Sequence, residues 1–523
     1  MLTLGLYKLE MQNTYFSNCF CFQEHKMAII PSEAEYEDTE AKIGMEELLH
    51  NTVDRLLLKK EIVSKLDNLT EQNDEEELHV NLVFKYGLDG SGDQKKYKQE
   101  HADNNTLLAS QMCPIRLVNR DTKRVIYENP LANCPCSHRP VRLSYEHETR
   151  ESVDEEYERM KSQIERMLPY SPKEGIVIHW VGIPTLMDGK ALTFVLDEAA
   201  HSTCPICGGK EKAISTIGKE FKVKTHVKGR RVNVLLHGMA PTHMWIRSAN
   251  LILNLGAYST IKKPKVQNDN DKAKRAKREE EIATRIKEEL NLTVFGKGPH
   301  GGGTLDGNTS RILFEHAELL SDVCRVPLEL ILALRKLCRG IASSRPMDPH
   351  KYKLAAEEFE RIFFQHYTSR DNQTSWYWLP CTIHKAVKHG EAIIRELPVP
   401  PGLAGEEGAE GNNKFFRNIR RDLTCKISAK RTLKDLFERL LAKSDPLMNE
   451  YVQEKYLRKR QDNKIPDDLK ELLTDEYLQS LDNDQAMESD TAEEAVEDEE
   501  DMDYSEDEND DDQMDIESDD ELI

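Results

Sequence analysis

Three carboxylates in this chain stand where they could hold divalent metal ions. Asp89 ends a strand-like run and begins the sequence Asp-Gly-Ser-Gly, Asp197 follows a second apolar run, and Glu410 lies in a stretch with helical spacing. Phosphodiester cleavage by two Mg²⁺ or Mn²⁺ ions requires hard oxygen donors on rigid supports. One aspartate at a strand end is usually only a turn residue, so the prediction depends on all three together. Asp93 and Glu198 are the nearest competitors for the two aspartate roles.

Two cysteines and two histidines form a second candidate site. Cys204 and Cys207 make a Cys-x-x-Cys chelate, and His384 and His389 have a separation usual for paired zinc histidines. In a reducing compartment this cysteine pattern indicates a metal or redox site more readily than a disulfide. The pairs predict a structural Zn²⁺ ion; a redox pair or an unliganded turn is the alternative. A third pair, Cys134-Pro-Cys136, is spaced too closely for a usual zinc site and is assigned no role.

Composition narrows the class of protein. The 523 residues carry a net charge of −22, but residues 482–523 hold 23 acidic and no basic side chains, which leaves 71 acidic against 72 basic residues elsewhere. Such an acidic run cannot bury enough apolar area to fold and is predicted to be disordered. A solubilising tail is the simpler interpretation, and a decoy for basic proteins or for the chain's own DNA-binding surface is the other. No stretch of about 18 apolar residues and no signal peptide is present, so an intracellular protein without a membrane span is expected.

Hydrophobic periodicity places the candidate residues on regular elements. Alternation over 79–88 predicts a half-buried strand that delivers Asp89, and the apolar runs 176–181 and 192–196 predict buried strands, the second of which delivers Asp197. Strands at 115–118, 124–127 and 141–145 complete the expected sheet.

Helices are predicted around and between these strands. Residues 43–66 have the spacing of one amphipathic helix, and Ser152-x-x-Glu155 has the pattern of a capping box that opens another. Residues 210–377 are expected to be mostly helical, with closing helices near 407–421 and 433–443. Strands, a helix and then strands again indicate an α/β sheet with helical cover.

Basic residues close to the acidic site indicate a nucleic-acid partner. Lys414, Arg417, Arg420 and Arg421 recur at helical spacing after Glu410 and could neutralise phosphates, although a solvated basic face explains them equally well. The basic run 272–278 is typical of a nuclear-import signal or of a charged helix start.

At these residues the chain resembles a known family, the Transib transposases and the related catalytic core of the V(D)J recombination-activating protein. The similarity extends from about residue 29 to 451. It is carried by Lys85-Tyr-Gly-Leu-Asp89-Gly-Ser-Gly, Lys98-Gln99, Arg139-Pro140, Tyr145-x-x-Glu148-Thr149, Asp197 seven residues before Cys204, Asp306-Gly-Asn-Thr309, Trp376-Tyr377, His384-Lys385, His389-Gly390, Glu410, Asn413-Lys414 and Ser444-Asp445-Pro446.

The resemblance implies an RNase H-like domain in which Asp89, Asp197 and Glu410 bind two divalent ions. It also implies zinc on the two cysteines and two histidines, within a helical insertion. The implied reaction is DNA nicking at a terminal repeat, hairpin formation and strand transfer by a nuclear homodimer, with a possible second protein subunit. Family members carry a further N-terminal DNA-binding segment, whereas the 28 residues before the match look unlike it.

The sequence therefore predicts a Mg²⁺-dependent transposase or endonuclease with an α/β, RNase H-like core split by a mostly helical zinc-binding insertion. The alternative is a repurposed, non-catalytic DNA- or chromatin-binding zinc protein. The expected organisation is an irregular N-terminus (1–28), a helical dimerisation or DNA-binding-like segment (29–78), the first part of the core (79–203), the insertion (204–390), the closing part of the core (391–450), a C-terminal helical segment (451–481) and the acidic tail (482–523).

Overall fold

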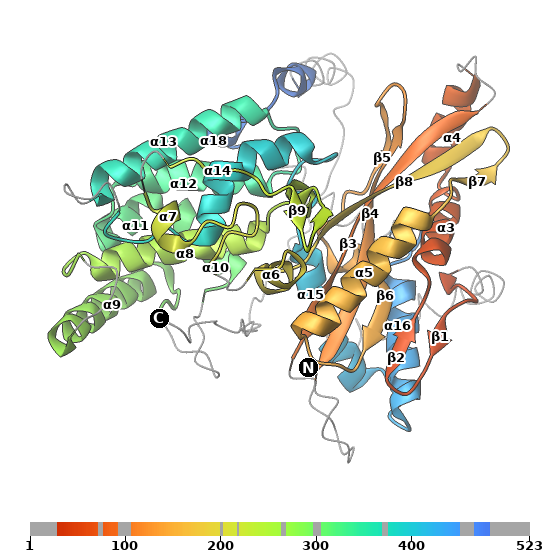
Figure 1. Cartoon of the computed structure of the whole chain (residues 1–523), viewed down its shortest axis with the longest axis horizontal. Helices are drawn as coiled ribbons and strands as arrows, with labels where there is room; N and C mark the ends of the chain where they lie inside the picture. The colour runs from red at the N-terminus through yellow and green to blue at the C-terminus, as the bar shows by residue number, and fades with distance from the viewer. Residues whose placement is uncertain are drawn as a thin grey trace, which may run out of the picture. The chain divides into compact units, whose positions relative to one another are not determined.

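The computed structural model has a mixed α/β fold, in agreement with the predicted class (Figure 1). It describes residues 29–71, 77–92, 106–198, 202–216, 219–262, 268–295, 305–368, 375–449 and 465–481. The predicted irregular N-terminus, the acidic tail, Asp93, Lys98 and Gln99 lie outside these ranges. No helix in the described ranges is both long enough and apolar enough to cross a membrane.

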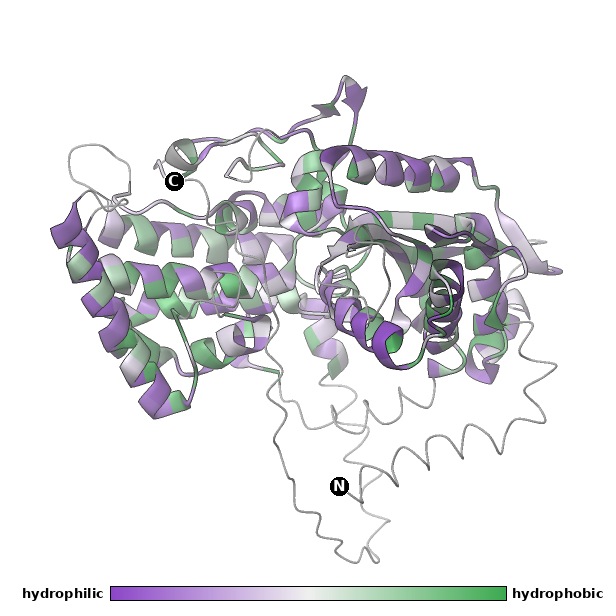
Figure 2. Ribbon diagram, turned by 90° about the horizontal axis from the view of Figure 1, so that it is seen from below, coloured by the Kyte–Doolittle hydropathy of each residue, from purple (hydrophilic) through white to green (hydrophobic). Residues whose placement is uncertain are grey.

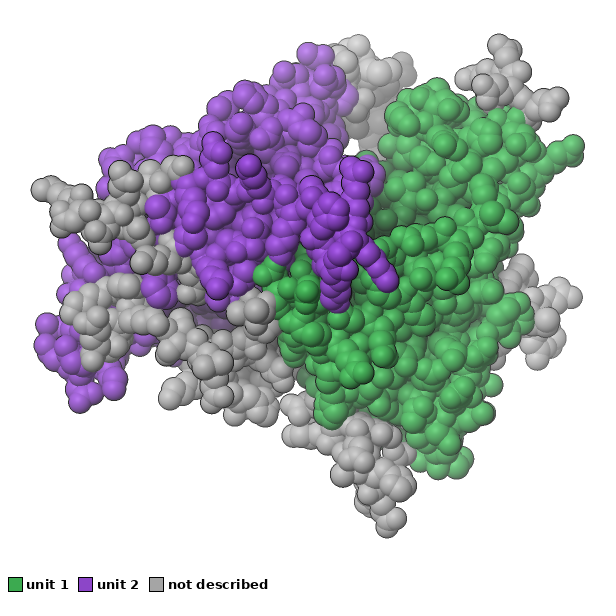
Figure 3. Space-filling view, viewed as in Figure 1, with its two compact units in different colours: residues 1–198, 403–463 green, residues 199–402, 464–523 purple. Residues whose placement is uncertain are grey.

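The chain divides into two compact units, which are coloured separately in Figure 3. Unit 1 comprises residues 1–198 and 403–463, and unit 2 comprises residues 199–402 and 464–523. Two separate stretches of sequence therefore build unit 1. The three predicted carboxylates all belong to unit 1, and the four predicted zinc ligands all belong to unit 2.

Unit 1 is built on one curled mixed sheet. Its strands are β1 (Glu35–Tyr36), β2 (Glu40–Lys42), β3 (Leu78–Ser91), β4 (Leu107–Asn119), β5 (Val125–Glu128), β6 (Arg139–Ser144), β7 (Tyr170–Lys173) and β8 (Ile176–Leu186). Their order is β1-β2-β6-β4-β3-β8-β7, with β5 paired to β4. The pairing of β3 with β8 is parallel, and every other pairing in this sheet is antiparallel.

Helices cover both faces of this sheet. They are α3 (Met45–Leu56), α4 (Lys60–Glu71), the short 3₁₀ helix η1 (Pro135–Ser137), α5 (Arg150–Arg166), α6 (Gly189–Val195), α15 (Glu407–Asp422) and α16 (Ala429–Lys443). In Figure 1, α5 crosses in front of the strands, whereas α15 and α16 lie behind them.

The alternation of side chains along β3 and β4 decides which residues meet which helix. Tyr86 of β3 and Ser110 of β4 hydrogen-bond to Tyr157 and Glu156 of α5. The neighbouring residues in each strand point to the opposite face, where α15 packs. Asp89 belongs to this second set, so the sheet presents it toward α15.

Unit 2 is mostly helical, as the sequence predicts for this region. Its elements are α7 (Glu211–Ile214), β9 (His226–Val227), β10 (Arg230–Arg231), η2 (Val234–His237), α8 (Pro241–Tyr258), α9 (Asp269–Leu290), α10 (Gly307–Glu315), α11 (Ala317–Cys324), α12 (Leu328–Ala342), α13 (Pro349–Tyr367), α14 (Cys381–Glu396) and α18 (Asp467–Lys470). Helix α8 is buried on most sides and contacts α9, α10, α11, α12 and α14, which makes it the core helix. Along the outer helices, hydrophobic and hydrophilic residues alternate (Figure 2).

Three local predictions are wrong. Residues 43–66 form two helices, because α3 ends at Leu56 and a turn precedes α4. The capping box of α5 is formed by Thr149 and Ser152, with Ser152 at the third helical position. Residues 192–196 belong to α6 and its C-terminal end instead of a strand. A short apolar run fits a buried strand and a buried helix equally well, so periodicity alone could not separate them.

A buried ion pair joins the two sequence segments of unit 1. Asp445, just after α16, accepts hydrogen bonds of 2.7 and 2.9 Å from the guanidinium of Arg55 in α3. The two side chains are 0% and 3% exposed. Removing one partner would leave an uncompensated charge inside the unit.

We therefore expect Asp445→Ala to lower the free energy of unfolding by about 3–5 kcal/mol. The matched control is Asp422→Ala, which breaks the exposed pair between Arg421 and Asp422 and should cost less than about 1 kcal/mol. Urea denaturation followed by circular dichroism measures both changes. Equal losses in the two variants would contradict the role assigned to the buried pair.

Candidate functional site

The parallel pairing of β3 and β8 places two aspartates at one edge of the sheet. Gly87 of β3 is the register partner of Leu186 of β8. A Cβ atom at Gly87 would collide with the Leu186 backbone, so only glycine permits this close approach. Asp89 and Asp188 each lie two residues beyond this pair. The carboxyl ends of both strands therefore present an aspartate side by side.

Asp188 also begins the helix that follows β8. Its side chain accepts a hydrogen bond of 2.6 Å from the backbone N–H of Ala191 and caps α6. Aspartate is among the preferred residues at this position because its oxygen satisfies a free N–H of the first turn. The cap fixes the Asp188 carboxylate at the strand end.

Helix α15 brings Glu410 to the same edge. Asn413 donates a 2.8 Å hydrogen bond from Nδ2 to Oδ2 of Asp89, and Asn412 donates one of 2.6 Å to Gln111 of β4. Glu410 lies three residues before Asn413 and so shares its side of the helix. The two asparagines hold against the sheet the side of the helix that carries Glu410.

Lys85 holds the chain segment that leads into α15. This residue of β3 is fully buried, and its Nζ donates hydrogen bonds of 2.5 Å to the Gly405 carbonyl and 2.8 Å to Asn133 Oδ1. Burial lowers the pKa of Lys85 to about 8, although nearby groups including Glu406 and Glu407 act in the opposite direction. The residue therefore anchors the segment before the Glu410 turn to the strand that carries Asp89.

The electrostatics of this edge favour a bound cation. Burial raises the pKa of the Asp89 carboxyl well above its usual range, and the negative charges of Asp188 and Glu410 raise it further. Glu148 adds a smaller effect in the same direction, while the hydrogen bond from Asn413 lowers the pKa. Carboxylate oxygens are the donors that a hard divalent cation prefers, and a bound cation would offset this repulsion.

The second aspartate predicted from the sequence occupies a different position. Asp197 follows α6 in a left-handed backbone conformation, with φ of 56°. Its carboxylate lies 3.5 Å from the guanidinium of Arg150 and is 57% exposed. The adjacent competitor Glu198 is buried, and its carbonyl accepts a hydrogen bond of 2.6 Å from Arg150. Asp188, not Asp197, is therefore the aspartate that the structure brings to Asp89.

A signal for Asp188 was present in the sequence. The apolar run that begins at Ile176 continues through Leu186 to Met187, and Asp188-Gly189 follows it directly. This is the same strand-then-Asp-Gly pattern that identifies Asp89. Ending the predicted strand at Val181 concealed it.

The predicted basic face of α15 is divided between two environments. Lys414 and Arg421 are exposed, and Arg417 is partly exposed with its Nε 3.4 Å from the Asn413 carbonyl. Arg420 is only 9% exposed, and its guanidinium lies 4.9 Å from the centre of the Tyr145 ring. Arg420 therefore packs inside unit 1, and the surface face is formed by the other three.

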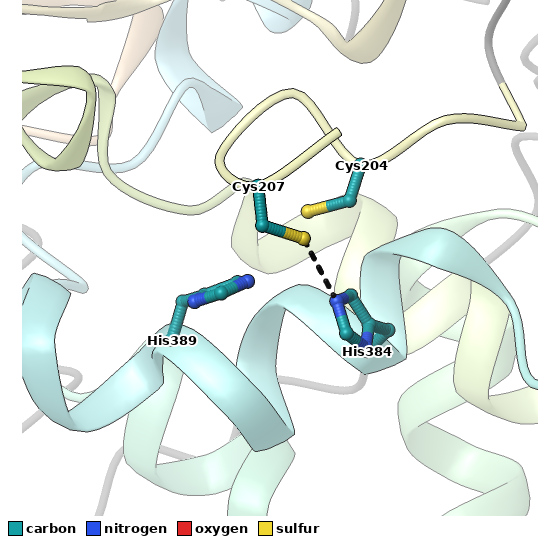
Figure 4. A group of neighbouring side chains, drawn as sticks. All are labelled: Cys204, Cys207, His384 and His389. Carbon is teal, nitrogen blue, oxygen red and sulfur yellow. Dashed lines mark hydrogen bonds between the residues drawn. The ribbon is translucent and has the colours of Figure 1, made fainter. Parts of the chain in front are cut away.

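The four predicted zinc ligands in unit 2 come together (Figure 4). Cys204 and Cys207 lie on a loop, and His384 and His389 project from α14. One donor atom from each residue lies within 4.8 Å of the others, and Cys207 Sγ is 3.4 Å from His384 Nε2. Cys204 and both histidines are buried. The arrangement could hold a metal ion.

The donor set fits such an ion. Buried polar atoms normally have a hydrogen-bond partner, yet His389 Nε2 has none within the described part of the chain. A lone pair on this nitrogen is available to a metal. Cys381, the first residue of α14, hydrogen-bonds to Cys204, and sequence reasoning did not identify this fifth polar neighbour.

Comparison with known proteins adds no assignment: neither a scan against protein-family models nor a search of the curated proteins finds a match to this chain.

Repulsion at the strand edge predicts an unusual effect of a conservative substitution. Asp188→Asn should raise the thermal unfolding temperature in buffer without added divalent cations, because it removes a negative charge beside Asp89 while asparagine caps α6 equally well. Asp197→Asn is the matched control and should have little effect, since it breaks only an exposed ion pair.

The pH dependence of this effect has a definite sign. A carboxyl whose pKa is raised by folding opposes folding once it is ionised. The cost is complete above the raised pKa of Asp89 and disappears as the pH falls toward the ordinary value of 3.8. The gain from Asp188→Asn should fade over the same range. Thermal unfolding of both variants between pH 4 and 8 measures it, and a larger gain from Asp197→Asn would contradict the assignment.

Proposed function

We propose that the chain is a divalent-metal-dependent DNA transposase or recombinase in which Asp89, Asp188 and Glu410 hold the catalytic ions. The observation that carries the proposal is that Asp188 and Glu410 lie near enough to the half-buried carboxyl of Asp89 for their charges to raise its pKa. This replaces Asp197 in the set predicted from the sequence. Two carboxylates at adjacent strand ends and one on a packed helix provide the rigid hard-oxygen donors that such chemistry requires.

Two Mg²⁺ or Mn²⁺ ions bound there would activate a water or a 3′-hydroxyl and stabilise the leaving oxygen of the cut phosphodiester. The chain's own residues hold the carboxylates in place. Asn413 orients Asp89, the α6 cap orients Asp188, and Lys85 holds the segment that leads to Glu410. Positioning of this kind reduces the reorganisation required in the transition state.

The resemblance to Transib transposases and the V(D)J recombination-activating core supports the class of reaction. Several residues that carry the resemblance surround the carboxylates, among them Lys85, Glu148 and Asn413. We therefore infer an RNase H-like core in unit 1, and double-stranded DNA as the substrate of a nuclear homodimer. Lys414, Arg417 and Arg421 form the surface of α15 that would neutralise phosphates.

We further propose that Cys204, Cys207, His384 and His389 bind structural Zn²⁺. Two thiolates and two imidazoles are a usual closed zinc set, which leaves no position for a substrate. The ion would join the loop of residues 204–207 to α14 inside unit 2. Its role would be to stabilise unit 2, separate from the chemistry at Asp89.

Zinc content tests this part directly. The purified chain should contain about one Zn²⁺ per molecule, and Cys204→Ser or His389→Ala should lose it, because three donors bind far more weakly than four. Cys425→Ser is the control, since this partly exposed cysteine lies in unit 1. Plasma mass spectrometry gives the stoichiometry. Full zinc retention by Cys204→Ser would overturn the assignment.

DNA cleavage tests the catalytic assignment. With Mg²⁺ or Mn²⁺ and a supercoiled plasmid, Glu410→Gln and Asp188→Asn should each reduce nicking by at least about 100-fold, because each removes a direct ligand. Asp197→Asn should nick at close to the parent rate. Gel analysis of end-labelled duplex then resolves hairpin and strand-transfer products.

Each outcome of the cleavage experiment has a definite meaning. Loss of nicking in Asp197→Asn but not in Asp188→Asn would return the second aspartate to the sequence-based choice. An inert parent chain that is folded and zinc-loaded would replace catalysis with the alternative, a non-catalytic DNA- or chromatin-binding protein.

A further inference from the structure

The pair Cys134-Pro135-Cys136, which neither candidate site uses, brings two sulfur atoms into contact. Cys136 donates a hydrogen bond from Sγ to Cys134 Sγ over 2.6 Å, and the backbone N–H of Cys136 also points to that sulfur at 3.4 Å. Neither cysteine takes part in a disulfide. The sulfurs are only about half an ångström farther apart than in a disulfide bond. Little movement would be needed to join them.

The positive charge of Lys443 acts on the two thiols, and its Nζ lies over the Phe415 ring, 3.0 Å from the ring centre. Nζ of Lys443, at the end of α16, is buried and has no hydrogen-bond partner in the described part of the chain. Burial lowers the pKa of Lys443 to about 8, while Cys136 and Cys134 act in the opposite direction. A nearby positive charge stabilises a thiolate, which is the reactive form of cysteine. Cys134 accepts the hydrogen bond from Cys136 and is partly exposed, so its sulfur is the accessible nucleophile.

The same segment packs against the turn of α15 that carries Glu410. A Cβ atom at Gly411 would collide with the ring of Pro135, and one at Gly408 would collide with the ring of His138. These two glycines lie on either side of Glu410 in the sequence. Asn449 holds the segment from the other side, with a 2.7 Å hydrogen bond to the Cys136 carbonyl. A change in η1 therefore acts directly on the first turn of α15.

We propose that Cys134 and Cys136 form a redox-sensitive dithiol, which hydrogen peroxide oxidises to a disulfide that displaces the first turn of α15. The Cys134 thiolate attacks one peroxide oxygen, so an S–O bond forms, the O–O bond breaks and hydroxide leaves. The Cys136 sulfur then attacks Cys134, so the S–S bond forms and the S–O bond breaks. The second hydroxide takes the Cys136 proton and leaves as water. Two electrons pass from the thiols to the peroxide, and a thiol reductant reverses the reaction.

Mass spectrometry of the full chain tests the modification itself. The folded protein is treated with graded hydrogen peroxide and then alkylated, and the peptide that contains both cysteines is analysed. We expect this peptide to lose two hydrogens and to lose alkylation at both positions together, with full recovery after dithiothreitol. Cys425, which is partly exposed but has no cysteine neighbour in the sequence, is the internal control and should keep its alkylation at the same peroxide dose.

Three results would overturn the proposal. The first is alkylation of Cys134 and Cys136 that persists at doses where Cys425 is already oxidised. The second is a disulfide from either cysteine to any residue other than its neighbour. The third is stoichiometric metal retained by the pair in the purified chain. None of these results depends on DNA cleavage, so failure here is distinct from failure of the proposed nuclease.

Two variants test the roles given to Lys443 and α15. Lys443→Met should slow disulfide formation, and Lys443→Arg should restore it, because the charge and not the shape of the side chain activates the thiol. Hydrogen exchange of residues 405–422 should increase on oxidation in the parent chain and stay unchanged in Cys134→Ser. Equal rates of disulfide formation in both Lys443 variants would contradict the role of the Lys443 charge. Unchanged hydrogen exchange in the oxidised parent chain would contradict the displacement of α15.

Discussion

The close parallel approach of β3 and β8 is the constraint on which the candidate catalytic site depends. It requires Gly87, because any side chain there would meet the backbone of Leu186. The pairing aligns two strand ends, so that Asp89 and Asp188 reach the same edge. A shift of one residue in the register would turn one aspartate to the opposite face and separate the pair. The position of both aspartates therefore depends on the close backbone contact between Gly87 and Leu186.

Helix α15 completes the site because the sheet holds it at several points. Asn412 and Asn413 bind residues of β4 and β3, while Lys85 binds the segment that precedes the helix. A fully buried lysine and a half-buried aspartate repelled by neighbouring carboxylates both cost folding free energy. Sites that perform chemistry commonly contain such locally unfavourable groups. The charged groups that make this end of the sheet costly to fold are thus the same groups that we propose for the metal site.

The cluster of two cysteines and two histidines in unit 2 follows a different principle. Its cysteines and histidines are separated by about 180 residues of helical chain, yet their donor atoms gather within 4.8 Å. Bonds to an ion can offset the entropy lost in bringing such distant segments together. The described residues of unit 1 include no such Cys/His cluster. Its two sequence segments are joined instead by contacts that include the buried ion pair of Arg55 with Asp445.

The sequence by itself determined the elements that depend on local periodicity and the residues that depend on local chemistry. Alternation located the strand of Asp89, helical spacing located the helix of Glu410, and residue type with spacing identified the cysteine and histidine pairs. Tertiary structure alone placed Asp188 near Asp89 and Asp197 away from it, because strand register and the helical state of residues 189–195 arise from packing between distant segments. It also decided that Arg420 packs on Tyr145 and that the sulfur of Cys136 meets that of Cys134. Spacing along a chain cannot reveal contacts whose partners are set by the fold.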